Sequence, residues 1–272
     1  MPWTEHQHAL LQEMGIRLWQ PPALKPAIDE PGLSTHEAVA VATPVTAAVP
    51  VPAKPPQARP APAAPPPQPP ANRERRPSAL DQMDWPTLRE TVAQCRACGL
   101  CEGRTQTVFG VGHEQARWML VGEAPGEQED REGEPFIGKA GQLLDAMLAA
   151  LDLTRASAEP ARQVYIANVL KCRPPHNRNP EPQEVAQCEP YLKRQVELVS
   201  PKLILAMGRF AVQSLLQTQE PIGRLRGKVH RYEGVPVVVT YHPAYLLRNP
   251  LDKARSWEDL CLAREVMAAA GA

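Results

Sequence analysis

Short apolar runs and longer amphipathic segments alternate along the chain between residues 117 and 269. The apolar runs are rich in β-branched and other aliphatic residues and occupy Arg117–Gly122, Gln163–Val169, Leu203–Gly208 and Val235–Tyr241. Continuous runs of this length are typical of strands that are buried on both faces. Apolar residues recur at helical spacing in the segments Lys139–Leu151, Glu181–Val199, Arg209–Gln217 and Lys253–Ala269. The alternation predicts an α/β fold, a parallel sheet with helices on both faces.

The chain before residue 78 has a different composition. Residues 44–70 contain twelve prolines in 27 positions, which is typical of an extended linker. Before them, His6–Trp19 carries a Leu, Met and Trp stripe at roughly helical spacing, but the segment is too short to be stable alone. We therefore predict an amphipathic docking segment at 1–24, a disordered Pro/Ala-rich linker at 25–77 and one globular domain at 78–272.

Charge and hydropathy exclude several classes of protein. Lys+Arg and Asp+Glu both total 30, which argues against coating of nucleic acid by bulk charge but leaves a local basic face open. No apolar stretch is long enough to span a bilayer, and Met1–Gln20 has no continuous apolar core of a signal peptide. We therefore expect a cytoplasmic, nucleoid-associated monomer without membrane contacts or a disulfide framework.

Four of the six cysteines have a spacing typical of a metal site. Cys95 and Cys98 form C-x2-C, 73 residues separate them from Cys172, and Cys188 completes C-x15-C. Four thiolates from two distant segments can enclose a zinc ion or an iron–sulfur cluster, and the spacing does not choose between them. Cys101 either neighbours this site or supplies an alternative ligand.

Polar groups that can do chemistry follow three of the four predicted strands. The first strand leads into GEAPGEQED, residues 122–130, which contains Glu123 and Glu129. Asn168 ends the second strand, and His242 follows the fourth. Each alone is compatible with an ordinary turn. Because the carboxyl ends of parallel strands meet at one edge of a sheet, where ligands bind, the three together predict a functional site.

One further motif resembles a phosphate-binding loop. Gly133–Ala140 reads GEPFIGKA, close to G-x4-G-K-[ST], but Ala140 replaces the hydroxyl residue that would hold magnesium. The motif also follows a charged segment and not a strand. These departures exclude a nucleoside triphosphatase, and Gly138 and Lys139 are expected to open the next helix.

The motifs together resemble a known family. C-x2-C, GEAPGEQED, EPFIGKAGQLLD, NVLKCRPP, C-x15-C and HPAYLLR, spread over residues 95–249, are similar to those of the family 4 uracil-DNA glycosylases, the iron–sulfur branch of that superfamily. The resemblance implies a three-layer α/β/α sandwich around a four-stranded parallel sheet. It also implies hydrolysis of the N-glycosidic bond of uracil in single- and double-stranded DNA. The implied cofactor is a [4Fe-4S] cluster held by Cys95, Cys98, Cys172 and Cys188.

The resemblance also implies roles for single residues. Phe136 would stack on the extruded uracil, and Ala124 and Asn168 would complete the substrate site. Asn168 offers a donor and an acceptor side by side, which match O4 and N3–H of uracil and mismatch cytosine. His242 would donate a hydrogen bond to O2 of the departing base.

Two further roles concern water and DNA. Either Glu123 or Glu129 would activate the water, and the sequence leaves the choice open. Leu246 and Leu247 would wedge into the DNA, while Arg248 and Lys171 would support the phosphate backbone.

Other activities remain compatible with these residues. A noncatalytic iron–sulfur DNA-binding or replication-associated module would keep the same fold, and a glycosylase for another deaminated base, such as hypoxanthine, would keep the same site. The string HALLQEMGIRLW, within residues 6–19, resembles the N-terminal segment of the psi subunit of bacterial DNA polymerase III, which docks on the clamp loader. That similarity implies a replication or repair protein as partner.

Overall fold

The structure is a computed structural model, and it describes residues 80–271. The predicted docking segment and linker, residues 1–24 and 25–77, lie outside the described residues. The helices are α2 (Trp85–Ala93), α3 (Glu127–Glu132), α4 (Gly138–Ala149), α5 (Pro182–Val199), α6 (Arg209–Leu216), α7 (Ile222–Leu225), α8 (Pro243–Arg248) and α9 (Lys253–Gly271). Four 3-10 turns join them: η1 (Leu80–Gln82), η2 (Gly99–Glu102), η3 (Pro175–Asn177) and η4 (Pro250–Asp252).

The strands form one sheet in the order β1-β3-β2-β4-β6-β5. They are β1 (Val111–Gly112), β2 (Trp118–Gly122), β3 (Tyr165–Asn168), β4 (Leu203–Met207), β5 (Val229–Tyr232) and β6 (Val235–Thr240). The four central strands are parallel, as predicted, and β1 and β5 pair antiparallel at the two edges. All residues of β2, β3 and β4 are buried, which is why their sequences read as continuous apolar runs.

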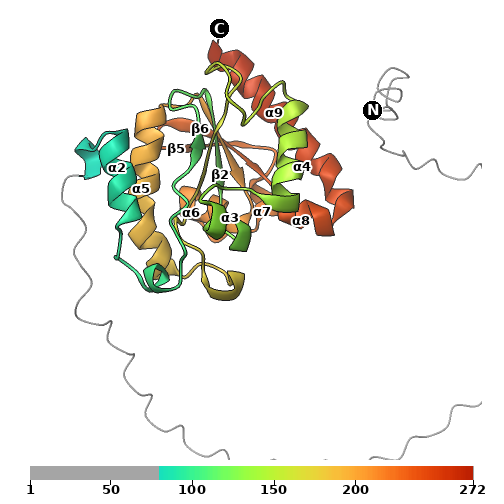
Figure 1. Cartoon of the computed structure of the whole chain (residues 1–272). Coiled ribbons are helices and arrows are strands. Elements are labelled where there is room, and N and C mark those ends of the chain that lie inside the picture. The colour runs from blue at the N-terminus through green and yellow to red at the C-terminus, as the bar shows by residue number, and fades with distance from the viewer. Residues whose placement is uncertain (1–79, 272) are drawn as a thin grey trace, which may run out of the picture. The chain divides into compact units, whose positions relative to one another are not determined.

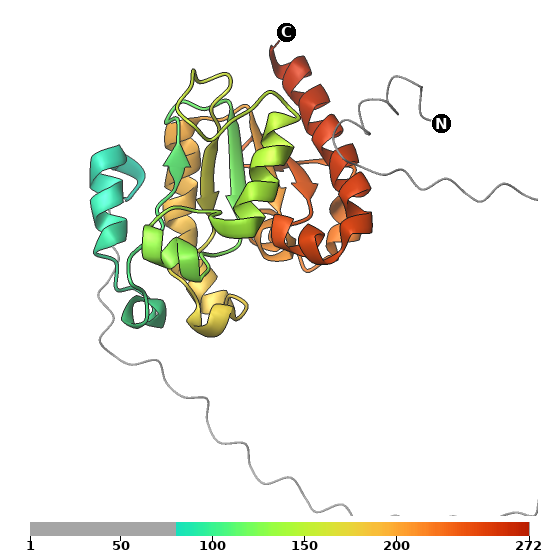
Figure 2. The same ribbon diagram turned by 45° about the vertical axis from the view of Figure 1, so that its right-hand side comes forward.

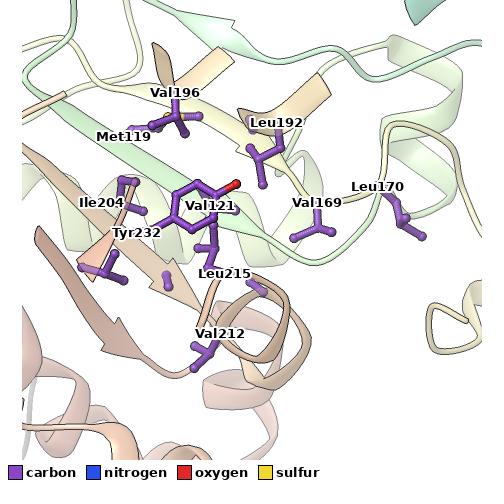
Figure 3. Close-up of a cluster of buried hydrophobic side chains, with 14 of the residues drawn as sticks. Met119, Val121, Val169, Leu170, Leu192, Val196, Ile204, Val212, Leu215 and Tyr232 are labelled. Carbon is purple, nitrogen blue, oxygen red and sulfur yellow. The ribbon is translucent and has the colours of Figure 1, made fainter. Parts of the chain in front are cut away.

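One face of the sheet packs against α5 and α6 (Figure 1). Alternate residues of the central strands point to this face, and they meet aliphatic side chains of the two helices (Figure 3). The shared cluster includes Met119, Val121, Ile204, Val237, Leu192, Val196, Val212 and Leu215. Each fully buried aliphatic side chain contributes about 1.5–3 kcal/mol. Helix α2 lies outside α5, where Leu88 and Val92 pack with Tyr191.

The opposite face of the sheet packs against α4 and α9, the green and red helices of Figure 2. The remaining alternate residues of the strands meet helix residues there, in a cluster that includes Trp118, Leu120, Ile166, Leu205, Val238, Leu144, Leu148, Leu260 and Ala263. The two clusters make a three-layer α/β/α sandwich. The fold class expected from the sequence is therefore confirmed.

The two edge strands are absent from the sequence prediction. Strand β1 has only two residues, too few for a periodic signal. Strand β5, with the sequence VHRY, is largely exposed and not apolar. It joins β6 through Glu233 and Gly234, which both have positive φ (46° and 81°), the backbone of a two-residue hairpin turn. No helix among residues 80–271 is long and apolar enough to cross a membrane.

Candidate active site

The ends of strands β2 and β3 form the floor of the site. Gly122 pairs in register with Asn168, the last residues of the two strands. A Cβ atom on Gly122 would lie 2.4 Å from Oδ1 of Asn168 and 2.5 Å from Cζ of Phe136. Only glycine at this position therefore lets both side chains close over the strand end. Asn168 is 2% exposed, and its side-chain amide takes no part in the hydrogen bonds of the described residues.

Phe136 and His242 meet above this floor from loops that are distant in sequence. Their rings stack with centroids 5.2 Å apart and planes inclined by 25°. Phe136 is buried and lies in the loop between α3 and α4, with a positive φ of 57°. His242 follows β6 and caps the N-terminus of α8. Gly208, at the end of β4, leaves room for it, because a Cβ there would lie 2.9 Å from Cβ of His242.

The environment of His242 sets its protonation and its tautomer. Its Nδ1 accepts a hydrogen bond from the backbone N–H of Ala244 at 3.2 Å, so the ring proton of the neutral form is on Nε2. Burial, helped by the positive charge of Arg248, lowers the pKa of His242 to about 4. The imidazole is therefore neutral at physiological pH and presents an N–H donor at Nε2.

The two candidate carboxylates stand in different environments. Both oxygens of Glu129 are occupied, since Oε2 accepts from the N–H of Gly126 at 3.1 Å and Oε1 from the N–H of Ile137 at 3.0 Å. Glu129 thereby caps α3 and holds the loop of Phe136. Glu123 follows Gly122 directly and is partly buried. Burial raises the pKa of Glu123 to about 7, although Arg209 opposes the shift. Ala124, next in sequence, packs on the edge of the core.

The structure corrects two of the expected DNA contacts. Lys171 is 1% exposed, and its Nζ donates to the backbone oxygen of Asn168 at 2.7 Å and to Oε1 of Gln195 at 2.6 Å. Leu246 is 1% exposed as well. Neither side chain can reach DNA, because each is enclosed by other elements of the domain.

The other two expected DNA contacts, Leu247 and Arg248, are exposed. They border an open groove of about 570 Å³ between α3, the start of α4 and α8, which is also lined by Gly126, Glu127, Gln128, Glu129, Arg131, Ile137, Lys139, Ala140, Asn177 and Ala244. Ile137 and Ala244 lie beside Phe136 and His242 in sequence. The groove therefore adjoins the candidate site.

The four cysteines of the predicted metal site line one cavity. Cys95 and Cys98 come from the segment after α2, Cys172 from the loop after β3, and Cys188 from α5. Cys101 lines the same cavity, and all six cysteines are free thiols. Burial raises the pKa of Cys172 to about 11 and that of Cys188 to about 12, so both are neutral thiols unless a metal binds.

A positively charged side chain also lines this cavity. Arg104 donates a hydrogen bond from Nη1 to Sγ of Cys172 at 3.2 Å, placing a cation beside this buried sulfur. Within residues 80–271, no set of three or more His, Cys, Asp or Glu side chains is close enough to hold a metal ion. Five cysteines and the guanidinium of Arg104 line the cavity, and sulfur donors of this kind suit either zinc or an iron–sulfur cluster.

Sequence reasoning missed the two glycines that shape the site. Gly122 and Gly208 end neighbouring apolar runs, and Gly208 has a positive φ of 87°. A glycine at the end of a buried strand often marks a close approach of other groups. That signal was present in the sequence. Which side chains approach the two glycines, however, depends on how the residues after β3 and β6 pack in the folded domain.

The sequence is similar to those of known proteins. Residues 109–263, more than half of the chain, match the uracil DNA glycosylase superfamily. A type-4 uracil-DNA glycosylase of Archaeoglobus fulgidus is 46% identical over 167 residues, 58% of this chain and 81% of the relative. One of Thermotoga maritima is 42% identical over 170 residues, 62% of this chain and 85% of the relative. A type-5 enzyme of Pyrobaculum aerophilum is 32% identical over 51% of this chain and 66% of the relative.

The chain therefore belongs to the uracil DNA glycosylase superfamily. Its higher identity to the type-4 relatives than to the type-5 relative places it in the type-4 branch. The resemblance inferred from the sequence motifs is confirmed.

Proposed function

We propose that the protein hydrolyses the N-glycosidic bond of uracil in single- and double-stranded DNA, using the site around Gly122. The observation that carries the proposal is the convergence of three groups on one strand end. These are the unpaired amide of Asn168, the ring of Phe136 and the Nε2–H donor of His242. A base inside a duplex cannot reach this site, so the nucleotide must be extruded first, at a cost of a few kcal/mol.

Recognition of uracil rests on Asn168 and Phe136. The amide of Asn168 pairs with O4 and N3–H of uracil, whereas cytosine would place its amino group against the amide donor. Because the site is buried, mispaired polar groups there are costly, and the discrimination is correspondingly large. The ring of Phe136 stacks on the base, and such a stack is worth about 1–3 kcal/mol.

Cleavage rests on His242 and a carboxylate. As the bond breaks, negative charge develops on uracil and positive charge on the sugar. The neutral imidazole of His242 stabilises the anion by donating its Nε2–H to O2. Glu123 positions and activates the water, because its carboxylate is free of hydrogen bonds within the described residues while both oxygens of Glu129 are engaged by backbone N–H groups. Glu129 then has a structural role.

DNA lies along the groove between α3, α4 and α8. Leu247 is 44% exposed at its rim and wedges into the base stack that the uracil leaves. Arg248 contacts the phosphate backbone, which positions the enzyme without reading sequence. A protein that repairs chromosomal DNA acts at the nucleoid in the cytoplasm.

Cys95, Cys98, Cys172 and Cys188 hold a [4Fe-4S] cluster. What supports this assignment is the common cavity, the guanidinium of Arg104 beside Cys172 and the membership of the type-4 branch. When bound, the cluster supplies a covalent clamp between the segment after α2, the loop after β3 and α5. It takes no part in bond cleavage in this scheme.

Residues 6–19 dock on a replication protein. The support is in the sequence alone, since this segment lies outside the described residues. Its apolar stripe fits helix-in-groove binding, and the proline-rich linker would raise the local concentration of the glycosylase at the partner.

Single-turnover excision from uracil-containing oligonucleotides tests the site. His242→Ala should lower the rate about 10²–10³-fold, the usual cost of losing one donor to a developing anion. Asn168→Ala should lower it strongly too, and Asn168→Asp should fail to restore it, because an aspartate lacks the donor to O4. All three should bind DNA with near wild-type affinity.

His113→Ala is the matched control. Its Nδ1 also accepts a backbone hydrogen bond, from the N–H of Gln115 at 3.0 Å, but His113 follows β1 beside the start of β3, away from the carboxyl ends of the parallel strands. It should keep the wild-type rate.

The same assay tests the alternative functions. Preferential release of hypoxanthine over uracil would favour hypoxanthine as the substrate. An absence of any base release by the iron-loaded wild type would favour a noncatalytic DNA-binding module.

A further inference from the structure

Phe136 is held in a backbone conformation that it would not adopt alone. Its φ of 57° is in the left-handed region, which disfavours residues with a Cβ atom. The loop that carries it spans only five residues between the end of α3 at Glu132 and the start of α4 at Gly138. Outside contacts must therefore keep the ring against His242.

The guanidinium of Arg155 supplies such contacts from the loop after α4. Nη1 donates to the backbone oxygen of Phe136 at 3.0 Å and to that of Pro135 at 3.2 Å. Nε donates to Oδ1 of Asp145, on α4, at 2.5 Å. One planar group thus ties the loop of Phe136 to the helix that follows it.

Helix α4 is shaped to receive the carbonyl group of Phe136. A Cβ atom on Gly141 would lie 1.8 Å from that oxygen, so only glycine allows the oxygen to rest against the helix. The Arg155 side chain is 21% exposed, and its Nη2 is buried without a hydrogen-bond partner among the described residues. The guanidinium is therefore enclosed behind the loop and fixed by its neighbours.

We infer that Arg155 is a positioning residue that fixes the ring of Phe136 for stacking on the extruded uracil. The inference rests on the proposed role of Phe136. Arg155 acts on the carbonyl side of Phe136, while the ring of Phe136 faces His242 on the other side of the same residue. A lysine could not replace it, because a single ammonium lacks the planar fork that reaches two carbonyl groups and a carboxylate at once.

A double-mutant cycle measures this coupling. We expect Arg155→Ala to lower kcat/KM for a uracil-containing oligonucleotide by about 10–100-fold, since misplacing a reacting geometry by about 1 Å can cost 10²-fold. Arg155→Lys should recover little of the loss. In a Phe136→Ala background, Arg155→Ala should cost less than about threefold more, because the ring that it positions is gone. Arg162→Ala is the control, since Arg162 bonds the backbone oxygen of Asp152 from the same loop at 3.3 Å.

The outcomes separate the inference from the function on which it rests. Wild-type kcat/KM in Phe136→Ala would remove the stacking role of Phe136, and the role of Arg155 with it. A loss in Phe136→Ala with none in Arg155→Ala, or losses that add fully in the double variant, would overturn the inference alone. If Arg155→Ala fails to fold, Asp145→Ala, at a half-exposed carboxylate, releases the same guanidinium and should show the same non-additivity with Phe136→Ala.

Discussion

At the scale of single residues, environment separates side chains that are alike in sequence. Glu123 and Glu129 belong to one short motif, yet backbone N–H groups occupy both oxygens of Glu129. The carboxylate of Glu123 has no such bonds within residues 80–271, and burial raises its pKa to about 7. His242 shifts in the opposite sense, to about 4, because burial disfavours the charged form of either group. Both groups act in the deprotonated form, so both require a pH above their pKa, and the higher pKa, that of Glu123, sets the limit.

The pH dependence of excision should therefore follow Glu123. The single-turnover rate should rise with pH through about 7 and level off above it, because only the carboxylate form accepts a proton from water. His242 should add no limb between pH 5 and 8, since its pKa is about 4. Arg209→Ala should move the rise to higher pH, as Arg209 lowers the pKa of Glu123. A rate that does not change between pH 5.5 and 8.5 would contradict the assignment.

The thermal stability of the protein should fall as pH rises through the range in which the excision rate increases, because both depend on the ionisation of Glu123. The folded protein holds the Glu123 proton more tightly than the unfolded chain, so stability falls as pH rises from the ordinary pKa of 4.5 to the folded pKa of about 7. Glu123→Gln should melt at a higher temperature than wild type at pH 8 and at nearly the same temperature at pH 4. Thermal unfolding at the two pH values measures the difference.

At the scale of elements, helix α8 places two neighbouring leucines in different environments. Leu246 is buried, while Leu247 is 44% exposed at the rim of the groove. Successive helical residues point about 100° apart, so two adjacent leucines in a surface helix cannot both face DNA. The motif HPAYLLR thus combines a leucine that anchors α8 to the core with an exposed leucine at the groove.

Three parts of the chain supply cysteines to the cavity: the segment after α2, the loop after β3 and α5. Removing one of these cysteines should therefore weaken both metal binding and the folded domain. We expect Cys172→Ala or Cys188→Ala to yield colourless, poorly soluble protein, because metal binding contributes to the free energy of folding at such sites. Cys261→Ala is the matched control, since Cys261 lies on α9 and not in the cavity. Iron and sulfide content and the visible absorption spectrum are the measurements. Zinc without iron or sulfide in the wild type would contradict the cluster.

At the scale of the whole molecule, catalysis and recruitment should be separable. Deleting residues 1–77 should leave oligonucleotide excision unchanged, because the described domain begins at Leu80 and contains the whole proposed site. The same deletion should abolish co-purification with a bacterial clamp-loader complex. Full-length protein with Leu11→Ala and Trp19→Ala should behave like the deletion in binding. A truncated protein that loses excision or fails to fold would show instead that the segment supports the domain.

The sequence by itself determined the central strands, the long helices that cover them and the family. Four strands, four helices and the order of polar groups at the strand ends were all readable, because burial on both faces leaves a continuous apolar run and helical burial leaves a periodic one. The motifs were long enough to indicate the type-4 family, which the comparisons confirm. These features depend on neighbours along the chain.

Only the tertiary structure decided which side chains face the site. Lys171 lies in a motif with Cys172 and was predicted to support the phosphate backbone, but α5 encloses it through Gln195. Arg155 lies in an unremarkable loop, and its contact with the backbone of Phe136 arises because α4 folds the two segments together. Burial and contact of a side chain are set by elements packed against it from far along the chain. No local pattern in the sequence carries that information.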